Sequence, residues 1–349
     1  MLKVSPLFTD GAVLCRGKEI RIFGEAEEGI PVRVELRDDQ DRILAQNEAE
    51  VTNGRFIALL PAQEAGSGRR LFISQGDESF KASDICIGEV YLASGQSNME
   101  WELQNADEGQ ELIKSHSNSL VRYFNVPRRA YFSDEAEEAF ANAHWIAVEP
   151  GKAGDMSAVA YFFAMKLQRE MEIPIGIVDC YWGGTSVSAW IDLETLERTS
   201  EGRNYMEREE RKSGGKSLEQ FLADEAAWQK ELQAWEKQVA EYKEIHPKAS
   251  GAEISREVGV CPWNPPAGPG SPYRPGALYD TMVARVTPLT LSGILWYQGE
   301  SDAGLTGQYD VLLISMIDLW RREFRDDKLP FLQVQLPMWI DSNAPGDSF

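Results

Sequence analysis

The sequence has few cysteines, few histidines and no long apolar run. Its 349 residues include 4 Cys and 3 His. Cys15, Cys86, Cys180 and Cys261 have neither the spacing of metal ligands nor the density of a disulfide framework, which predicts free thiols in a reducing compartment. No window approaches the roughly 18 uncharged apolar residues that a membrane span needs. The segment after Met1 lacks a signal-peptide core, so we expect a cytoplasmic protein unless a leader has been removed.

Positive charge is also scarce. The chain has 35 Lys and Arg against 56 Asp and Glu, a formal net charge of -21. Such a charge repels polyphosphates and anionic lipids and leaves no basic stripe for nucleic acid. We therefore expect no nucleic-acid partner and no membrane partner, and neutral substrates are favoured. The sequence shows no metal-ligand motif, and no cofactor is expected.

The length predicts two domains, because single cores stop growing near about 250 to 300 residues. Residues 1–84 have the short, alternating apolar runs of strands, and Asn53-Gly54 is a strong hairpin signal. This part is predicted to be a small antiparallel β-sandwich of roughly 80 residues. Its predicted strands lie at 20–23, 32–36, 43–45, 56–60 and 71–74.

Residues 85–349 show a different period, in which strands alternate with helices. Near-continuous apolar runs are typical of strands buried on both faces of a parallel sheet. Amphipathic helices are predicted at 156–171 and 309–324, where apolar residues recur on one face. The second domain is thus predicted to be a doubly wound α/β domain. Its predicted strands lie at 90–93, 121–124, 175–178, 293–296 and 331–334.

An insertion interrupts this domain at residues 197–275. Its first half predicts a helix with a narrow apolar seam, and its second half is rich in proline and predicts an extended loop. We expect a helical arm that covers the domain surface. A homodimer contact or a lid over the substrate are the alternatives, since long loops in compact domains are often functional. The seam residues are Leu218, Phe221, Trp228, Leu232, Trp235, Val239 and Tyr242.

The first motif with chemical meaning is residues 95–99, Gly-Gln-Ser-Asn-Met, which directly follow a predicted buried strand. This placement puts the hydroxyl of Ser97 at the carboxyl edge of the sheet, where α/β proteins bind ligands. The alternative is that Ser97 only caps the next helix. The motif is not the Gly-x-Ser-x-Gly elbow of α/β-hydrolases, because Met99 stands where the second Gly is required.

Two further motifs also follow predicted strands. Residues 182–186, Trp-Gly-Gly-Thr-Ser, contain the pair Gly183 and Gly184, whose N–H groups suit an oxyanion hole, although a plain tight turn is the alternative. In residues 296–302, Gln298 can donate an amide N–H to an oxyanion, and Trp296 or Tyr297 can offer an apolar face to a sugar ring. The three motifs are predicted to converge at one sheet edge.

Together, residues 95–99, 183–186 and 296–301 resemble the three blocks of the sialate O-acetylesterase family, a branch of the SGNH hydrolases that includes acetylxylan esterases. Residues 6–14 are similar to the start of the family's amino-terminal β-domain. The resemblance covers most of the chain apart from the insertion. It implies an SGNH-type three-layer α/β/α domain with a parallel sheet after the small β-sandwich domain.

The resemblance also implies roles for individual residues. Ser97 is the expected nucleophile. The oxyanion hole is expected to comprise the Ser97 N–H, Gly183 or Gly184, and Gln298. Glu300 carries over only as a motif position, and our own expectation is that it orients Gln298 or the nucleophile loop by hydrogen bonding. The residues predicted to contact substrate are Gln96, Asn98, Trp182, Trp296 and Tyr297.

The family's general base comes from an Asp-x-x-His-Pro segment after the last strand, and the sequence up to Phe349 contains no such segment. His116 is predicted at the opposite sheet edge, and His144 has no link to the motifs. His246 lies in a similar Glu-Ile-His-Pro context but within the insertion. We therefore expect the catalytic Asp and His beyond residue 349, so that the chain alone has impaired activity.

The predicted activity is hydrolysis of acetyl esters on carbohydrate, either sialic acid or xylan-type sugars, through an acyl-enzyme on Ser97. One alternative is a glycosidase that uses Glu300 with a second carboxylate. The other is a carbohydrate-binding protein that has lost catalysis because the base is missing.

Overall fold

The structure is a computed structural model, and it describes residues 1–337. Its amino-terminal part is built from short strands that pair mainly in antiparallel fashion, such as β3 with β7 and β4 with both β5 and β8. The predicted runs between residues 20 and 74 are all strands. The elements are β1 (Lys3–Val4), η1 (Pro6–Phe8), β2 (Val13–Cys15), β3 (Ile20–Glu25), β4 (Val32–Arg37), β5 (Ile43–Ala49), β6 (Val51–Thr52), β7 (Arg55–Leu60) and β8 (Gly66–Gln75).

The predicted hairpin at Asn53-Gly54 is confirmed. The two residues join β6 to β7, with Val51 opposite Phe56. Both have positive φ, 53° and 72°, as a two-residue hairpin turn demands.

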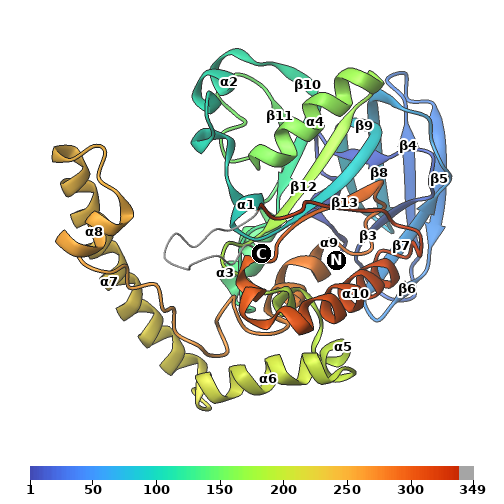
Figure 1. The fold of residues 1–349 in the computed structure, drawn as a ribbon. Helices are drawn as coiled ribbons and strands as arrows, with labels where there is room; N and C mark the ends of the chain where they lie inside the picture. Colours follow the sequence, from blue (N-terminus) through green and yellow to red (C-terminus); the bar gives the residue numbers. More distant parts are fainter. Residues whose placement is uncertain (338–349) are drawn as a thin grey trace.

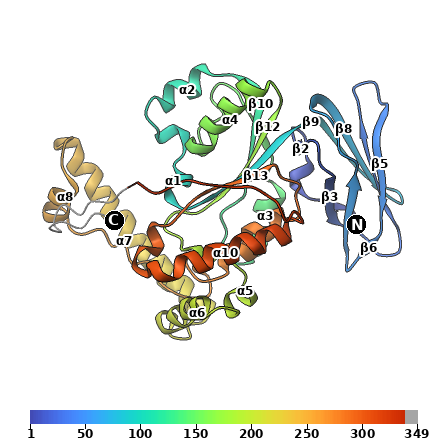
Figure 2. The same ribbon diagram turned by 45° about the vertical axis from the view of Figure 1, so that its right-hand side comes forward.

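The long strand β9 (Glu78–Gly95) connects the two parts of the molecule, as Figure 2 shows. Its first half pairs with β8, and its second half is central to the carboxyl-terminal sheet. The predicted boundary between residues 84 and 85 lies inside this strand, where Asp84 has a φ of 54°. The two predicted domains therefore share a continuous strand.

The carboxyl-terminal part of the sheet has the strand order β11-β10-β12-β9-β13-β14. All neighbours are parallel except β11, which runs antiparallel to β10. The five predicted strands are present, but β11 was not predicted, and the sheet is mixed rather than parallel throughout. The strands are β10 (Asn118–Asn125), β11 (Trp145–Val148), β12 (Ile175–Tyr181), β13 (Gly293–Tyr297) and β14 (Phe331–Gln333).

Helices pack on both faces of this sheet (Figure 1). On one face Tyr161 of α4 packs in a cluster with Ile177, and on the other Trp320 of α10 packs in a cluster with Val178. Consecutive strand residues thus face different helices, which is why these strands are apolar throughout. The helices outside the insertion are α1 (Ser97–Glu100), η2 (Leu103–Asn105), α2 (Gly109–Ser115), α3 (Asp134–Ala141), α4 (Ala158–Met171), η3 (Val187–Trp190), α5 (Leu193–Glu197), η4 (Tyr279–Val283), α9 (Ala284–Val286), η5 (Glu300–Leu305) and α10 (Thr306–Glu323).

The insertion forms α6 (Ser200–Ser213), α7 (Leu218–Ile245) and α8 (Gly251–Glu257). A capping box between Ser217 and Gln220 begins α7. At the base of α7, the Phe221 ring is buried against Gly268 and Gly270, where added Cβ atoms would lie 2.7 and 2.6 Å from it.

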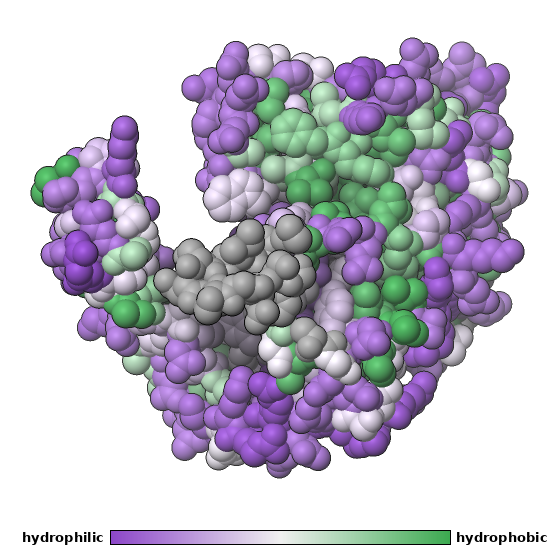
Figure 3. All heavy atoms as spheres, in the orientation of Figure 1, coloured by the Kyte–Doolittle hydropathy of each residue, from purple (hydrophilic) through white to green (hydrophobic). Residues whose placement is uncertain are grey.

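The predicted position of this arm is wrong. Figures 1 and 2 show α7 and α8 extending away from the body instead of covering it, and in Figure 3 the tip of the arm stands clear of the body. The apolar seam of α7 instead contacts the returning segment of the insertion itself. The indole N–H groups of Trp228 and Trp235 donate to the carbonyl oxygens of Pro262 and Gly259.

Candidate active site

The three sequence motifs begin where three neighbouring parallel strands end. In the sheet register, Tyr181 of β12 and Tyr297 of β13 both pair with Gly95 of β9. Because the strands are parallel and in this register, the residues that follow them emerge at one point of the sheet edge. The predicted convergence of the motifs is confirmed.

The turn before Ser97 is fixed by contacts with the neighbouring strand ends. Gly95 has a φ of 140°, and an added Cβ would lie 2.1 Å from the carbonyl oxygen of Tyr297, so no side chain fits there. The Gln96 N–H donates to that same carbonyl oxygen at 3.0 Å. The Gln96 side-chain oxygen accepts from the N–H groups of Gly299 and Ser301, both at 3.2 Å.

Gln96 is consequently buried, with 3% of its surface exposed, and its amide oxygen is engaged within the protein. This position differs from the predicted substrate contact. The side chain instead locks the nucleophile turn to the third motif, and it leaves the neighbouring Ser97 exposed to solvent.

Ser97 lies beside the glycine pair of the second motif. A Cβ added to Gly183 would be 3.5 Å from both Cα and Cβ of Ser97. The Gly183 N–H donates to a carboxylate oxygen of Glu100, and the other oxygen of Glu100 pairs with Arg128. The predicted oxyanion donor is therefore near the nucleophile, but in this structure Glu100 occupies it.

Gln298 is buried and donates both amide hydrogens within the protein. Its Nε2 lies 3.0 Å from the Thr185 carbonyl oxygen and 2.6 Å from Oδ2 of Asp302. The carboxylate partner fixes the amide orientation, because a flipped amide would place two acceptors in contact. The predicted role of Gln298 as oxyanion donor would require a different rotamer, and here it holds the second and third motifs together.

Asp302, which the sequence analysis did not single out, is the centre of this buried network. Its carboxylate accepts from the Val187 N–H at 3.0 Å, from Gln298, and from the Tyr205 hydroxyl of α6 at 2.7 Å. Three donors thus compensate for the cost of burying the charge. The sequence signal that could have identified Asp302 is its position in the third motif, five residues after Tyr297.

Glu300 contacts the nucleophile turn rather than Gln298. Its Oε1 accepts from the Asn98 side-chain amide at 2.6 Å. Of the two predicted roles of Glu300, the structure shows the contact with the nucleophile loop. Asn98, predicted to contact substrate, has this amide donor directed to Glu300.

Among the aromatic residues predicted to contact the sugar, the prediction for Trp296 is wrong. It is 1% exposed and packs edge to face with Trp190 and Trp320, at centroid distances of 6.1 and 5.7 Å. Its side chain faces the α10 side of the sheet because strand residues alternate between faces. Tyr297 and Trp182 are partly buried and pack against the two core clusters.

Two aromatic residues from the insertion lie next to the glycine pair, and sequence reasoning missed them as site residues. A Cβ added to Gly184 would be 3.3 Å from Cζ2 of Trp263 and 3.2 Å from Cε1 of Tyr273. Burial, with the charges of Glu100 and Glu225 nearby, raises the pKa of Tyr273 to about 12, so its hydroxyl keeps its proton. No spacing pattern in the sequence links them to the motifs.

None of the three histidines is part of the group of residues described above around Ser97. His116 ends α2, His144 contacts the carbonyl oxygen of Asn142, and His246 stacks on Tyr242 at the tip of α7. Within residues 1–337, no hydrogen bond joins a histidine to Ser97. In this range there is also no group of three or more His, Cys, Asp or Glu arranged to hold a metal ion. None of its helices is long and apolar enough to cross a bilayer.

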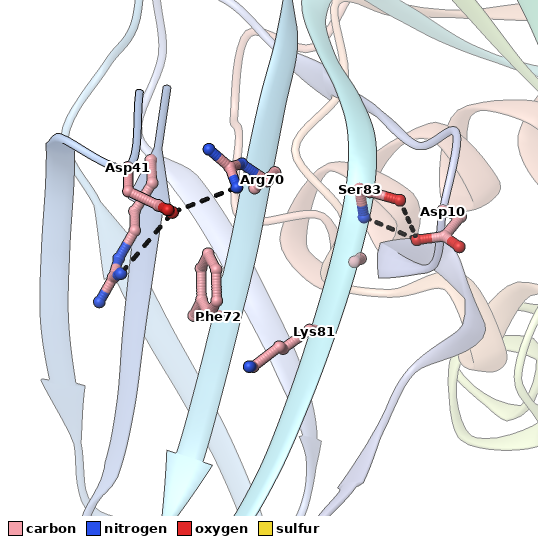
Figure 4. Close-up of a pocket in the computed structure, with 8 residues that line it drawn as sticks. Asp10, Asp41, Arg70, Phe72, Lys81 and Ser83 are labelled. Carbon is pink, nitrogen blue, oxygen red and sulfur yellow. Dashed lines mark hydrogen bonds and ion pairs between the residues drawn. The ribbon is translucent and has the colours of Figure 1, made fainter. Parts of the chain in front are cut away.

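A distinct surface hollow lies on the amino-terminal strands, far along the chain from the motifs (Figure 4). Its charged groups are largely paired with one another. Asp41 faces Arg37 and Arg70, and Asp10 accepts from the N–H and hydroxyl of Ser83. None of the three motifs lines this hollow. We place the candidate active site at Ser97 instead, where the three motifs converge.

Comparisons with known proteins agree with this geometry. Residues 256–345 match the family model described as a carbohydrate esterase, sialic acid-specific acetylesterase. A carbohydrate acetylesterase from Xanthomonas citri superimposes with a TM-score of 0.66 and 26% identity, covering 96% of this chain and 60% of that chain. The fold and the converging motifs therefore place the chain among relatives of the carbohydrate esterases, which are carboxylic ester hydrolases.

The curated relatives agree with this class. The chain is 25% identical to the sialate O-acetylesterase of Mus musculus and 25% identical to that of Homo sapiens, over 94% of this chain in both cases. The predicted resemblance to the sialate O-acetylesterase family is thereby confirmed. The chain spans 58% of the length of the mouse protein and 55% of the human one.

Proposed function

We propose that this protein hydrolyses acetyl esters on carbohydrates with Ser97 as the nucleophile. The observation that carries the proposal is the shared register of Tyr181, Gly95 and Tyr297, which brings the exposed Ser97 to the glycine pair. The names of the relatives given above support an ester as the bond that is hydrolysed and a carbohydrate as the substrate. They give no support to the glycosidase alternative.

In the proposed reaction the Ser97 oxygen attacks the acetyl carbonyl carbon, and the carbonyl oxygen becomes an oxyanion near Gly183 and Gly184. Collapse of this intermediate releases the sugar hydroxyl and leaves an acetyl group on Ser97. Water then attacks the acyl-enzyme, releases acetate and restores the serine. The proton of Ser97 passes to a general base, which returns it to the departing sugar oxygen, and the family resemblance expects this base in an Asp-x-x-His segment.

Glu100 adds a condition to this reaction. Its carboxylate accepts from the Gly183 N–H, and a negative charge at that position disfavours an oxyanion. The N–H is available to the intermediate only after Glu100 moves away, and Arg128 is the cation that already holds one of its oxygens. Substrate binding is therefore expected to displace Glu100 toward Arg128.

We also propose that the chain consists of a small β-sandwich followed by an SGNH-type α/β/α domain. Helices on both faces of the mixed sheet support a three-layer SGNH-type domain, and the antiparallel pairs before β9 support a preceding β-sandwich. The cytoplasmic location and a dimer contact through α7 stay predictions.

The test compares the wild type with Ser97→Ala. With the general base of the Asp-x-x-His segment present, we expect Ser97→Ala to lower the hydrolysis of ethyl acetate and of acetylated xylo-oligosaccharide at least about hundredfold, because the nucleophile is lost. Mass spectrometry of the wild type treated with a serine-directed organophosphonate should place the adduct on Ser97.

The matched control is Ser115→Ala, which removes an exposed hydroxyl at the end of α2. It should hydrolyse both esters at the wild-type rate. Equal rates for the wild type and Ser97→Ala, or an adduct on another serine, would reject Ser97 as the nucleophile.

A further inference from the structure

An exposed indole lies beside the candidate active site. Trp263, in the proline-rich segment of the insertion, has 57% of its surface exposed. Its ring nevertheless contacts the second motif, since a Cβ on Gly184 would be 3.3 Å from it. A single exposed aromatic side chain is ordinary by itself, but the place of Trp263 beside Gly184 makes its ring accessible to a ligand bound at the three motifs.

The arm holds this indole in place. The Trp263 ring packs edge to face against Trp228 of α7, with centroids 6.1 Å apart. The Trp228 indole N–H donates to the carbonyl oxygen of Pro262 at 2.7 Å, and that of Trp235 donates to Gly259 at 2.9 Å. These tethers and the rigid proline backbone fix the segment before any ligand arrives.

The indole is also within reach of a substrate at Ser97. The contacts of Ser97 with Gly183 and of Gly184 with Trp263 place the ring no more than about 14 Å from Ser97 Cβ, since consecutive Cα atoms are about 3.8 Å apart. A sugar of one or two rings attached to an acetyl group at Ser97 spans this range. Tyr273, on the same side of Gly184, offers a hydroxyl donor beside the indole.

We infer that Trp263 is the platform on which the sugar ring of the acetylated substrate stacks, and that Trp228 positions it. The insertion thus supplies the carbohydrate-binding face that Trp296, buried in the core, does not. This inference rests on the proposed esterase function and identifies the part of the protein that recognises the sugar.

Binding is measured in the Ser97→Ala background, where turnover is suppressed. Acetylated xylo-oligosaccharide and 9-O-acetyl-N-acetylneuraminic acid are each titrated by calorimetry, and the tighter ligand is used for the variants. We expect Trp263→Ala to weaken binding about five- to tenfold, the size of one aromatic contact. Trp263→Phe should retain most of the affinity, and Trp228→Phe should give an intermediate loss because it removes the tether to Pro262.

The matched control is Phe162→Ala, which removes an aromatic ring that is 50% exposed on α4. It should bind as the parent does, and circular dichroism should show unchanged folding for all variants. Equal affinity of Trp263→Ala and the parent would overturn the inference, as would failure of the parent to bind either sugar. Neither outcome bears on the proposed esterase function. That function is tested separately by the hydrolysis of ethyl acetate, an ester without a sugar, by the wild type.

Discussion

At the scale of single residues, burial controls the charge of Asp179 at the end of β12. The side chain is 2% exposed, its Oδ2 accepts from the Ser157 N–H at 3.1 Å, and its Oδ1 has no partner among the described residues. Burial raises the pKa of this carboxyl to about 7. In the unfolded chain the group ionises near its ordinary value of about 4. The native protein therefore keeps a proton that the unfolded chain releases.

The sign of the pH effect follows from this difference. Between about pH 4 and pH 7 the native state binds more protons, so its stability falls as pH rises, and above pH 7 the loss is complete. The Asn side chain of Asp179→Asn cannot ionise, so the stability of this variant does not fall in the same way as pH rises. We expect its free energy of unfolding to rise relative to the wild type by about 2 kcal/mol between pH 5 and pH 8. Urea unfolding at each pH measures it.

The control for this prediction is Asp107→Asn, since Asp107 is exposed. Its stability should follow the wild type at every pH. Parallel pH curves for Asp179→Asn and the wild type would show that Asp179 is ionised in the native protein.

At the scale of elements, the arm depends on a small anchor. Phe221, 1% exposed, packs its ring against Gly268 and Gly270, and these glycines leave the space that the ring fills. Farther along α7, the contacts are mainly with the returning segment of the insertion. One buried ring thus connects the helix that carries Trp228 to the loop that carries Trp263.

Phe221→Ala is expected to loosen this anchor. Removing a buried Phe ring costs about 3 to 5 kcal/mol where the site cannot collapse. If the cost is local, hydrogen exchange of the amides at 262–270 should accelerate at least about tenfold, because the segment opens without global unfolding. Leu222→Ala is the adjacent control, with a side chain already 36% exposed. Unchanged exchange at 262–270 in Phe221→Ala would mean that the proline-rich segment is held independently of α7.

At the scale of the whole molecule, the net charge of -21 is the largest single electrostatic feature. Ion pairs do not offset it, because many join exposed side chains, as between Lys237 and Glu241 with 78% and 63% exposure. Such pairs contribute about 0 to 1 kcal/mol each. Mutual repulsion of the excess carboxylates therefore decides the response to salt.

Adding salt is expected to stabilise the protein. Raising NaCl from 20 to 300 mM shortens the screening length to below about 10 Å and weakens the repulsion more than the exposed pairs. We expect Tm to rise by about 1 to 3 °C in differential scanning calorimetry at pH 7.5. Choline chloride at the same ionic strength should give the same shift, which separates screening from binding of a specific cation. A lower Tm in high salt would show that the ion pairs dominate.

Local sequence determined much of this protein. The strands, the hairpin at Asn53-Gly54 and the convergence of the three motifs follow from apolar runs that end in glycine, because side-chain period and backbone freedom act over a few residues. The prediction that Ser97 and Gly183 meet needed only parallel strands with motifs at their carboxyl ends.

Tertiary packing alone decided the rest. It buried Trp296, committed Gln298 to Asp302 and Thr185, and placed Glu100 on the Gly183 N–H. It also brought Trp263 of the insertion to Gly184, 79 positions earlier in the numbering of the chain. Which face a strand residue occupies and which distant segment packs on it depend on the whole fold, and no short-range pattern carries that information.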